Sequence, residues 1–140
     1  YNIKISEFNS PYSDYGGSFL GNKLVFTTTR DTGGAFKSKM KWTNGAFSNF
    51  YQVSFDNDGS ANKAERFNSK VNSVLNESSA VFTADGKTMY FTRNNYLNGK
   101  RHKNNREQVL LKLYKATLDD GKWGDVEELP FNSDEFSTAH

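Results

Sequence analysis

Cysteine is absent from the chain, and only two of its 140 residues are proline. The lack of cysteine excludes a disulfide framework, a thiolate zinc site and a cysteine nucleophile. No run of 18 apolar residues occurs, so no segment is predicted to span a membrane as a helix. The net charge is only +2, from 18 Lys and Arg against 16 Asp and Glu, and it gives no reason to expect a nucleic-acid partner.

Hydrophobic residues are also scarce, at 35% of the chain. That fraction alone favours disorder, but aromatic residues make up 15% of the sequence, with 12 Phe, 7 Tyr and 2 Trp. Each buried ring removes roughly 150–250 Å² from water, and disordered segments are poor in such rings. The composition therefore predicts a folded chain built from short strands.

An internal repeat with a period of about 64 residues is the main signal in the sequence. Three pairs of segments match in the same order: residues 21–27 with 86–92, 50–59 with 113–121, and 67–69 with 131–133. A third unit begins at Asn132, where residues 132–139 resemble residues 72–80. The repeat predicts two similar structural units and the start of another.

Each unit has the alternation and turn residues of four strands. The expected strands are residues 17–20, 23–29, 50–55 and 64–67 in the first unit, and 80–83, 88–92, 109–117 and 123–129 in the second. No helix is expected. The pairs Asp85-Gly86 and Asp120-Gly121 are predicted to form hairpin turns, because glycine adopts the positive φ that two-residue hairpins require.

Four antiparallel strands followed by the next four are typical of a β-propeller. We therefore predict an all-β fold, a β-propeller fragment of about two four-stranded antiparallel blades plus the start of a third. The expected divisions are a leading segment 1–8, blades 9–71 and 72–131, and a truncated blade from residue 132. Residues 30–49 and 94–108 are predicted to be exposed loops inserted between the second and third strands. Propellers typically have 4–8 blades, so the chain is expected to be part of a larger propeller.

The second unit resembles the PD40 (WD40-like, TolB-like) propeller repeat. The motif residues that carry this resemblance are Asn72, Glu77, Asp85, Gly86, Tyr90 and Phe91. Longer strings at 9–16, 91–96 and 128–135 are similar to propellers of Bacteroidota OmpA-family, peptidoglycan-associated outer-membrane lipoproteins, of the type associated with type IX secretion and gliding. The resemblance covers residues 9–140.

The motif residues have expected physical roles. Tyr90 and Phe91 alternate along a strand, so their rings are expected to face opposite neighbours. Asn72 and Glu77 are expected to bond backbone groups where one blade passes to the next.

The resemblance implies a non-catalytic binding or scaffold module in the periplasm, associated with the outer membrane. The implied partner is a cell-envelope protein, with PorP/SprF-type outer-membrane proteins as candidates, and peptidoglycan would be bound only through an OmpA domain absent from this chain. The alternative is the propeller of a prolyl-oligopeptidase-like peptidase or another hydrolase. Carboxylates clustered at inner-strand ends would favour that alternative, and residues 17–20 and 80–83 contain none.

No catalytic residue, metal ligand or cofactor site is predicted. Residues 56–60 resemble the start of an EF-hand loop, but Phe67 stands where the loop needs its bidentate Glu. Neither His102 nor His140 has a second ligand at metal-binding spacing, and no Gly-x-Ser-x-Gly motif is present. The chain is therefore not expected to be an enzyme.

A basic segment at residues 100–106 is the candidate partner-binding feature, because it holds four Lys or Arg and no acid. Either it is a solvated loop, or it docks an acidic partner or an anionic glycan. Tyr96 is included because it either stacks on a ligand or fixes the loop. The candidate residues are Tyr96, Lys100, Arg101, His102, Lys103 and Arg106.

Overall fold

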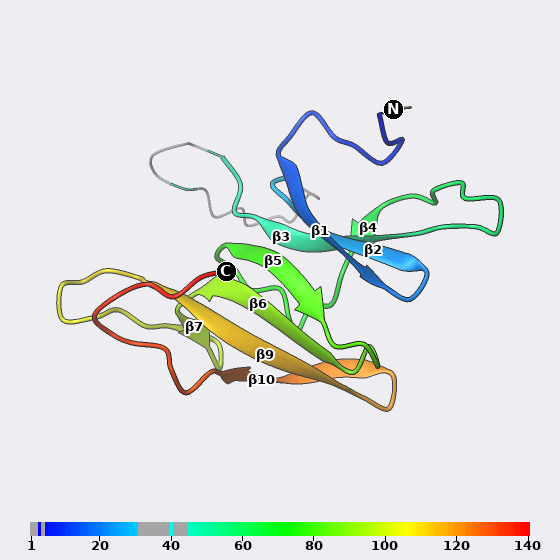
Figure 1. Ribbon diagram of the computed structural model, residues 1–140. Helices are drawn as coiled ribbons and strands as arrows, with labels where there is room; N and C mark the ends of the chain where they lie inside the picture. The colour runs from blue at the N-terminus through cyan, green and yellow to red at the C-terminus, as the bar shows by residue number, and fades with distance from the viewer. Residues whose placement is uncertain (1–2, 4, 31–39, 41–44) are drawn as a thin grey trace.

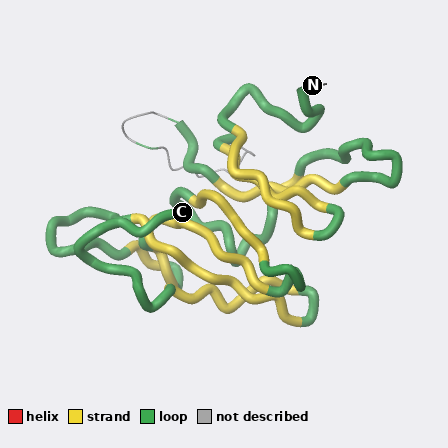
Figure 2. Tube along the Cα trace, viewed as in Figure 1, coloured by secondary structure: helices red, strands yellow, loops and turns green. Residues whose placement is uncertain are grey.

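The computed structural model describes residue 3, residues 5–30, residue 40 and residues 45–140 (Figure 1). Most of the expected insertion 30–49 lies outside the described residues. The described residues form strands and loops only, so they contain no helix that could cross a membrane (Figure 2).

The described residues form two four-stranded antiparallel sheets and one small two-stranded sheet. The first sheet has the order β1 (Asp14–Leu20), β2 (Lys23–Thr28), β3 (Asn49–Ser54) and β4 (Glu65–Arg66). The second sheet runs β5 (Glu77–Phe82), β6 (Thr88–Asn94), β9 (Leu111–Asp119) and β10 (Lys122–Glu128). The predicted all-β class and its two four-stranded antiparallel sheets are confirmed.

The inner strands begin three residues earlier than the sequence pattern predicted. β1 begins at Asp14 and β5 at Glu77, because each strand contains a bulge that breaks the alternation of side chains. The bulges contain Gly16, with φ of 63°, and Ser79, with φ of 44°. They also face each other, since a Cβ added to Gly16 would lie 3.3 Å from Ser79 Oγ.

The hairpin turns differ in length. Asp120 and Gly121 both have positive φ, 45° and 71°, and join Asp119 directly to Lys122 as a two-residue hairpin turn. The expectation of a two-residue turn at Asp85-Gly86 is wrong, because only Gly86 has positive φ and the loop is closed by Thr83 N donating to Thr88 O at 3.0 Å. The Asp85 carboxylate stabilises this longer loop by accepting from Thr83 Oγ1 at 2.6 Å.

The main core lies where the two sheets meet, with β1 in contact with β5 (Figure 1). Val25 and Phe50 of the first sheet are fully buried in one cluster with Met89 and Phe91 of the second. The Phe50 and Phe91 rings meet edge to face, with centroids 5.8 Å apart. A smaller cluster around Phe26, Tyr51 and Val53 covers the other face of the first sheet.

An asparagine fixes the end of each sheet in the same way. Asn72 Oδ1 accepts from Phe50 N at 2.7 Å, and its Nδ2 donates to Phe50 O at 3.0 Å. Asn132 makes the same pair of bonds to Leu113, at 2.9 Å and 2.7 Å. The repeat seen in the sequence is therefore also a repeat of hydrogen bonds.

The last four residues form hydrogen bonds to the second sheet that match those formed by residues 76–79, at the start of β5, to the first sheet. At the first sheet, Ser48 N donates to Asn76 Oδ1 (2.9 Å), Glu77 N donates to Ser48 O (3.0 Å) and Ser79 N donates to Thr27 Oγ1 (3.2 Å). At the second sheet, Leu111 N donates to Ser137 Oγ (3.0 Å), Thr138 N donates to Leu111 O (2.8 Å) and His140 N donates to Thr92 Oγ1 (3.3 Å). Residues 137–140 thus occupy on the second sheet the position that residues 76–79 occupy on the first.

Candidate functional site

A carboxylate begins each inner strand, so the expectation that these strands contain none is wrong. Asp14 bonds Arg30 at 2.9 Å, and Ser10 donates to it through its backbone N at 2.7 Å. Burial opposes ionisation, but the hydrogen bonds from Thr28, Arg30 and Ser10 hold the pKa of Asp14 below its usual 3.8. The bulge interrupts the side-chain alternation, so the sequence pattern did not include Asp14 in the strand.

Glu77 occupies the equivalent position in the second sheet and is fully buried. Burial raises its pKa from 4.5 to about 8, although hydrogen bonds from Ser73 and the nearby Arg93 favour the charged form. One oxygen, Oε2, has no hydrogen-bond partner within the described residues. Perturbed carboxylates often mark catalytic sites, but no substrate can reach a side chain with no exposed surface. Glu77 is therefore assigned a structural role.

The other motif residues of the repeat lie in the core or its turns. Phe91 is fully buried against Phe50, whereas Tyr90 is half-buried on the opposite face of the second sheet. Asn72 bonds both backbone groups of Phe50, as described above. Asp85 and Gly86 form the loop between β5 and β6.

Residues 94–108 were expected to form a simple exposed loop, and this expectation is wrong. The segment begins with a hairpin formed by β7 (Tyr96–Leu97) and β8 (Lys100–Arg101). Asn98 and Gly99 form its turn, with positive φ of 51° and 78°. Asn-Gly is a strong hairpin signal, and it was the sequence feature that could have predicted this element.

The hairpin is attached to the core at its base. Asn95 is buried, its N donates to Leu110 O at 2.8 Å, and its O accepts from His102 N at 2.9 Å. The half-buried Tyr96 ring lies 6.0 Å from the Arg93 guanidinium carbon, so it packs on the core. This contact holds the Tyr96 ring against Arg93 at the base of the hairpin.

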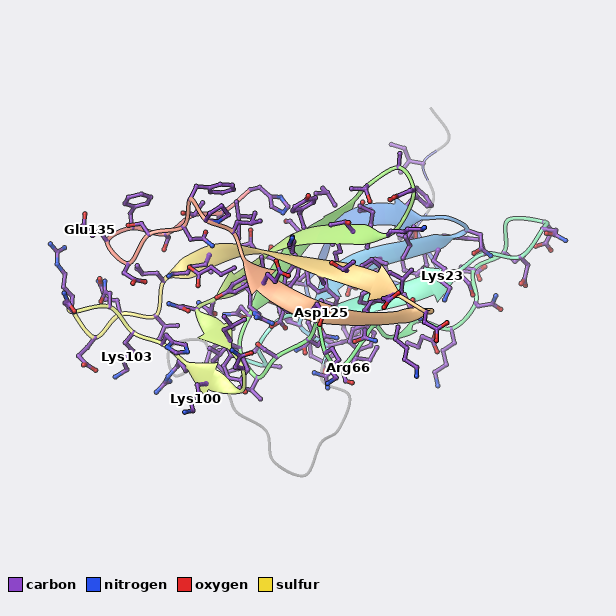
Figure 3. All side chains as sticks on the ribbon, turned by 90° about the horizontal axis from the view of Figure 1, so that it is seen from below. Lys23, Arg66, Lys100, Lys103, Asp125 and Glu135 are labelled. Carbon is purple, nitrogen blue, oxygen red and sulfur yellow. The ribbon has the colours of Figure 1, made fainter. Side chains whose placement is uncertain are left out.

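The predicted partner-binding cations differ in their surroundings. Lys103 forms an ion pair with Glu107, whereas Lys100, Arg101 and Arg106 are exposed and have no acidic partner within the described part of the chain. Lys100 and Lys103 lie at the same end of the molecule as Glu135 (Figure 3). We call Lys100, Arg101 and Arg106 the basic surface.

A cleft of about 230 Å³ lies beside the basic surface and was not predicted from the sequence. It is lined by Asn95, Leu97, His102, Lys103, Lys112, Glu128 and Asp134.

Lys112 is buried at this cleft, where its Nζ bonds Glu128 at 2.8 Å and Asp134 at 2.6 Å. Burial disfavours its charge, but the two carboxylates raise its pKa above the usual 10.5. The same contact lowers the pKa of Asp134. The sequence separates these three residues on different strands and turns, so only the fold brings them together.

Within the described residues, no group of three or more His, Asp or Glu side chains lies close enough together to hold a metal ion. Comparison of the chain with protein-family models, curated proteins and solved structures finds no match.

Proposed function

We propose that this chain is part of a β-propeller that acts as a non-catalytic docking module for an acidic protein partner. The observation that carries the docking role is the basic surface. Lys100 and Arg101 lie on a hairpin fixed to the core through Tyr96 and Asn95, and Arg106 lies in the loop that follows it. All three are exposed and have no acidic partner among the described residues. A preformed surface loses little conformational freedom when it binds, and pooled charge steers an acidic partner toward it.

The propeller is supported by equivalent positions on the two sheets. Val25 and Phe50 are fully buried by the second sheet, whereas Tyr90 and Leu113, their counterparts, are only half-buried. A third sheet placed on the second would bury them in the same way. Residues 137–140 already make the hydrogen bonds that its first strand requires.

The residues before Asn9, Asn72 and Asn132 support the same arrangement. Phe8 packs on Phe26, with centroids 5.5 Å apart, and Val71 is fully buried in the second sheet's core. Phe131 precedes Asn132 in the same way but is 60% exposed. In the proposed propeller Phe131 packs into the core of the next sheet.

The cellular setting rests on the sequence resemblance. The module is proposed to lie in the periplasm at the outer membrane, to bind a PorP/SprF-type protein, and to reach peptidoglycan only through an OmpA domain outside this chain. The alternative, a hydrolase propeller, requires a catalytic domain elsewhere in the protein.

The basic surface is tested by removing its charge. Wild-type protein and the triple variant Lys100→Ser, Arg101→Ser, Arg106→Ser are titrated with a solubilised PorP/SprF-type protein. The titrations use about 0.1 M and about 1 M salt, where the Debye length is ~10 Å and ~3 Å. We expect wild-type binding to weaken at least tenfold at high salt, and the variant to bind weakly at both.

A matched control removes three exposed lysines elsewhere, through Lys63→Ser, Lys70→Ser and Lys122→Ser. It carries the same net charge as the basic-surface variant and should bind like wild type. Equal binding by all three proteins, without salt dependence, would show that the basic surface is only solvated.

A further inference from the structure

The cleft beside the basic surface contains hydrogen-bond donors and acceptors with free bonding capacity. We propose that it binds a neutral sugar unit, such as one hexose ring of a glycan. This site is separate from the basic surface and takes a different class of ligand.

Both donors and acceptors line the cleft. Lys112 Nζ has three hydrogens and uses two of them on Glu128 Oε1 and Asp134 Oδ1. The remaining oxygens, Glu128 Oε2 and Asp134 Oδ2, accept no hydrogen bond within the described part of the chain. The Asn95 amide accepts from Tyr114 OH at 3.4 Å, and its NH₂ group has no partner among the described residues. A hydroxyl both donates and accepts, so adjacent sugar hydroxyls match such a surface.

Charge selects against anionic ligands. The buried Lys112 ammonium bonds the Glu128 and Asp134 carboxylates, and the Lys103 ammonium is paired with Glu107, so three carboxylates stand against two ammonium groups at the cleft. An anionic ligand would therefore be repelled. A neutral polar ligand avoids this repulsion and still forms hydrogen bonds to charged groups, which are stronger than those between neutral groups.

The size and one apolar wall fit the same ligand. A water molecule takes about 30 Å³ in the liquid, so the cleft holds the volume of about eight waters. That is below the ~300–1,000 Å³ of sites for drug-sized ligands and suits one ring. Leu97 supplies an apolar contact for the C–H face of a sugar.

The test uses the whole chain and ¹H–¹⁵N NMR titration with six probes. Four are neutral: glucose, galactose, mannose and N-acetylglucosamine. Glucosamine and glucuronate carry a positive and a negative charge on the same ring. We expect saturable, millimolar binding of at least one neutral sugar, with shifts at Asn95, Leu97 and Asp134, and at least tenfold weaker binding of glucuronate. Tighter binding of glucosamine than of every neutral sugar would overturn the choice of a neutral ligand.

Variants distinguish the cleft from other surfaces. Asp134 is largely exposed, so Asp134→Ala should keep the fold and weaken sugar binding at least tenfold. Asp119→Ala removes an exposed carboxylate outside the cleft and should bind like wild type. No saturable binding of any neutral sugar, shifts confined to another surface, or wild-type affinity in Asp134→Ala would overturn the proposal.

This result is independent of the partner-docking role. Binding of a neutral sugar should change little with salt and should survive the triple substitution of the basic surface. Loss of salt-dependent partner binding in that variant would therefore leave the sugar site intact, and a failed sugar titration would leave the docking proposal intact.

Discussion

Asp14 and Glu77 occupy the same position in the two sheets, but their surroundings give them opposite pKa shifts. Asp14 is paired with Arg30, and its pKa lies below the usual value. Glu77 is deeper and has no ion pair within 4 Å among the described residues, so burial raises its pKa to about 8. The two acids therefore contribute to stability in different pH ranges.

The raised pKa of Glu77 predicts a loss of stability as pH rises. Between pH 4.5 and about 8 the folded state keeps the proton that the unfolded state releases, so the free energy of unfolding falls across this window. Glu77→Gln cannot ionise and should be more stable than wild type near pH 8, by on the order of a few kcal/mol. Urea unfolding followed by tryptophan fluorescence at several pH values measures the difference.

The exposed Glu65 supplies the control for this measurement, since Glu65→Gln makes the same chemical change without burial. Its stability curve should follow that of wild type. If Glu77→Gln loses the same stability as wild type between pH 4.5 and 8, another group is responsible for the effect.

Asn72 gives a second prediction at the residue scale. Asn72→Ala leaves the buried N–H of Phe50 without its acceptor, whereas Phe50 O still accepts from Phe67 N at 2.9 Å. One unsatisfied buried group costs about 1–3 kcal/mol, and we expect the free energy of unfolding to fall by that amount in denaturant titrations. Asn132→Ala removes the same bonds at a half-buried position, so water can replace them and the loss should be smaller.

The hairpin of β7 and β8 shows how a short element can be ordered without a core of its own. Its turn has two residues with positive φ, and its base is held by Asn95 and by the Tyr96 contact to Arg93. An isolated two-stranded hairpin is marginally stable in water. The turn and the base together are therefore what place Lys100 and Arg101.

Gly99→Val should loosen this hairpin locally. A β-branched residue at φ of 78° is strained by roughly 1–2 kcal/mol, which corresponds to about tenfold faster amide exchange in residues 96–101. Global stability should change little, because the hairpin lies outside the main core. Gly124→Ala is the matched control, since Gly124 has ordinary φ and open space around it. Unchanged exchange in Gly99→Val would mean that the turn does not order the hairpin.

At the scale of the whole molecule, the interface between the sheets is where most of the buried aromatic surface lies. The two faces of the second sheet differ, because one covers Phe50 and Val25 and the other leaves Leu113 and Tyr90 half-buried. This asymmetry is expected for a unit that stacks on copies of itself, as the proposed propeller does.

Truncating the equivalent residues Phe50 and Leu113 to alanine compares how much each buried or half-buried face contributes to stability. Phe50→Ala should lower the free energy of unfolding by about 3–5 kcal/mol, whereas Leu113→Ala should cost less than about 2 kcal/mol in this chain. In a longer form of the protein that includes the next sheet, the cost of Leu113→Ala should rise to that of a core leucine. An unchanged cost in the longer form would contradict the proposed stacking.

Local patterns predicted most of the strands but not all of their ends. β2, β3, β6 and β9 have clear alternation, and their expected positions agree with the structure to within two residues. β1 and β5 were predicted too short because Gly16 and Ser79 form bulges that interrupt the alternation. The missed β7–β8 hairpin lacks alternation altogether, and only its Asn-Gly turn marks it.

The sequence by itself determined the all-β class, the repeated four-stranded units and the cluster of cations, because these depend on period, turn residues and composition. The tertiary structure decided which of those cations are free. It also decided that Glu77 is buried and that Lys112, Glu128 and Asp134 meet at one cleft. Burial and ion pairing depend on which strands become neighbours: Lys112 reaches Glu128 and Asp134, 16 and 22 positions away in the chain, only when β9 and β10 pair in the second sheet.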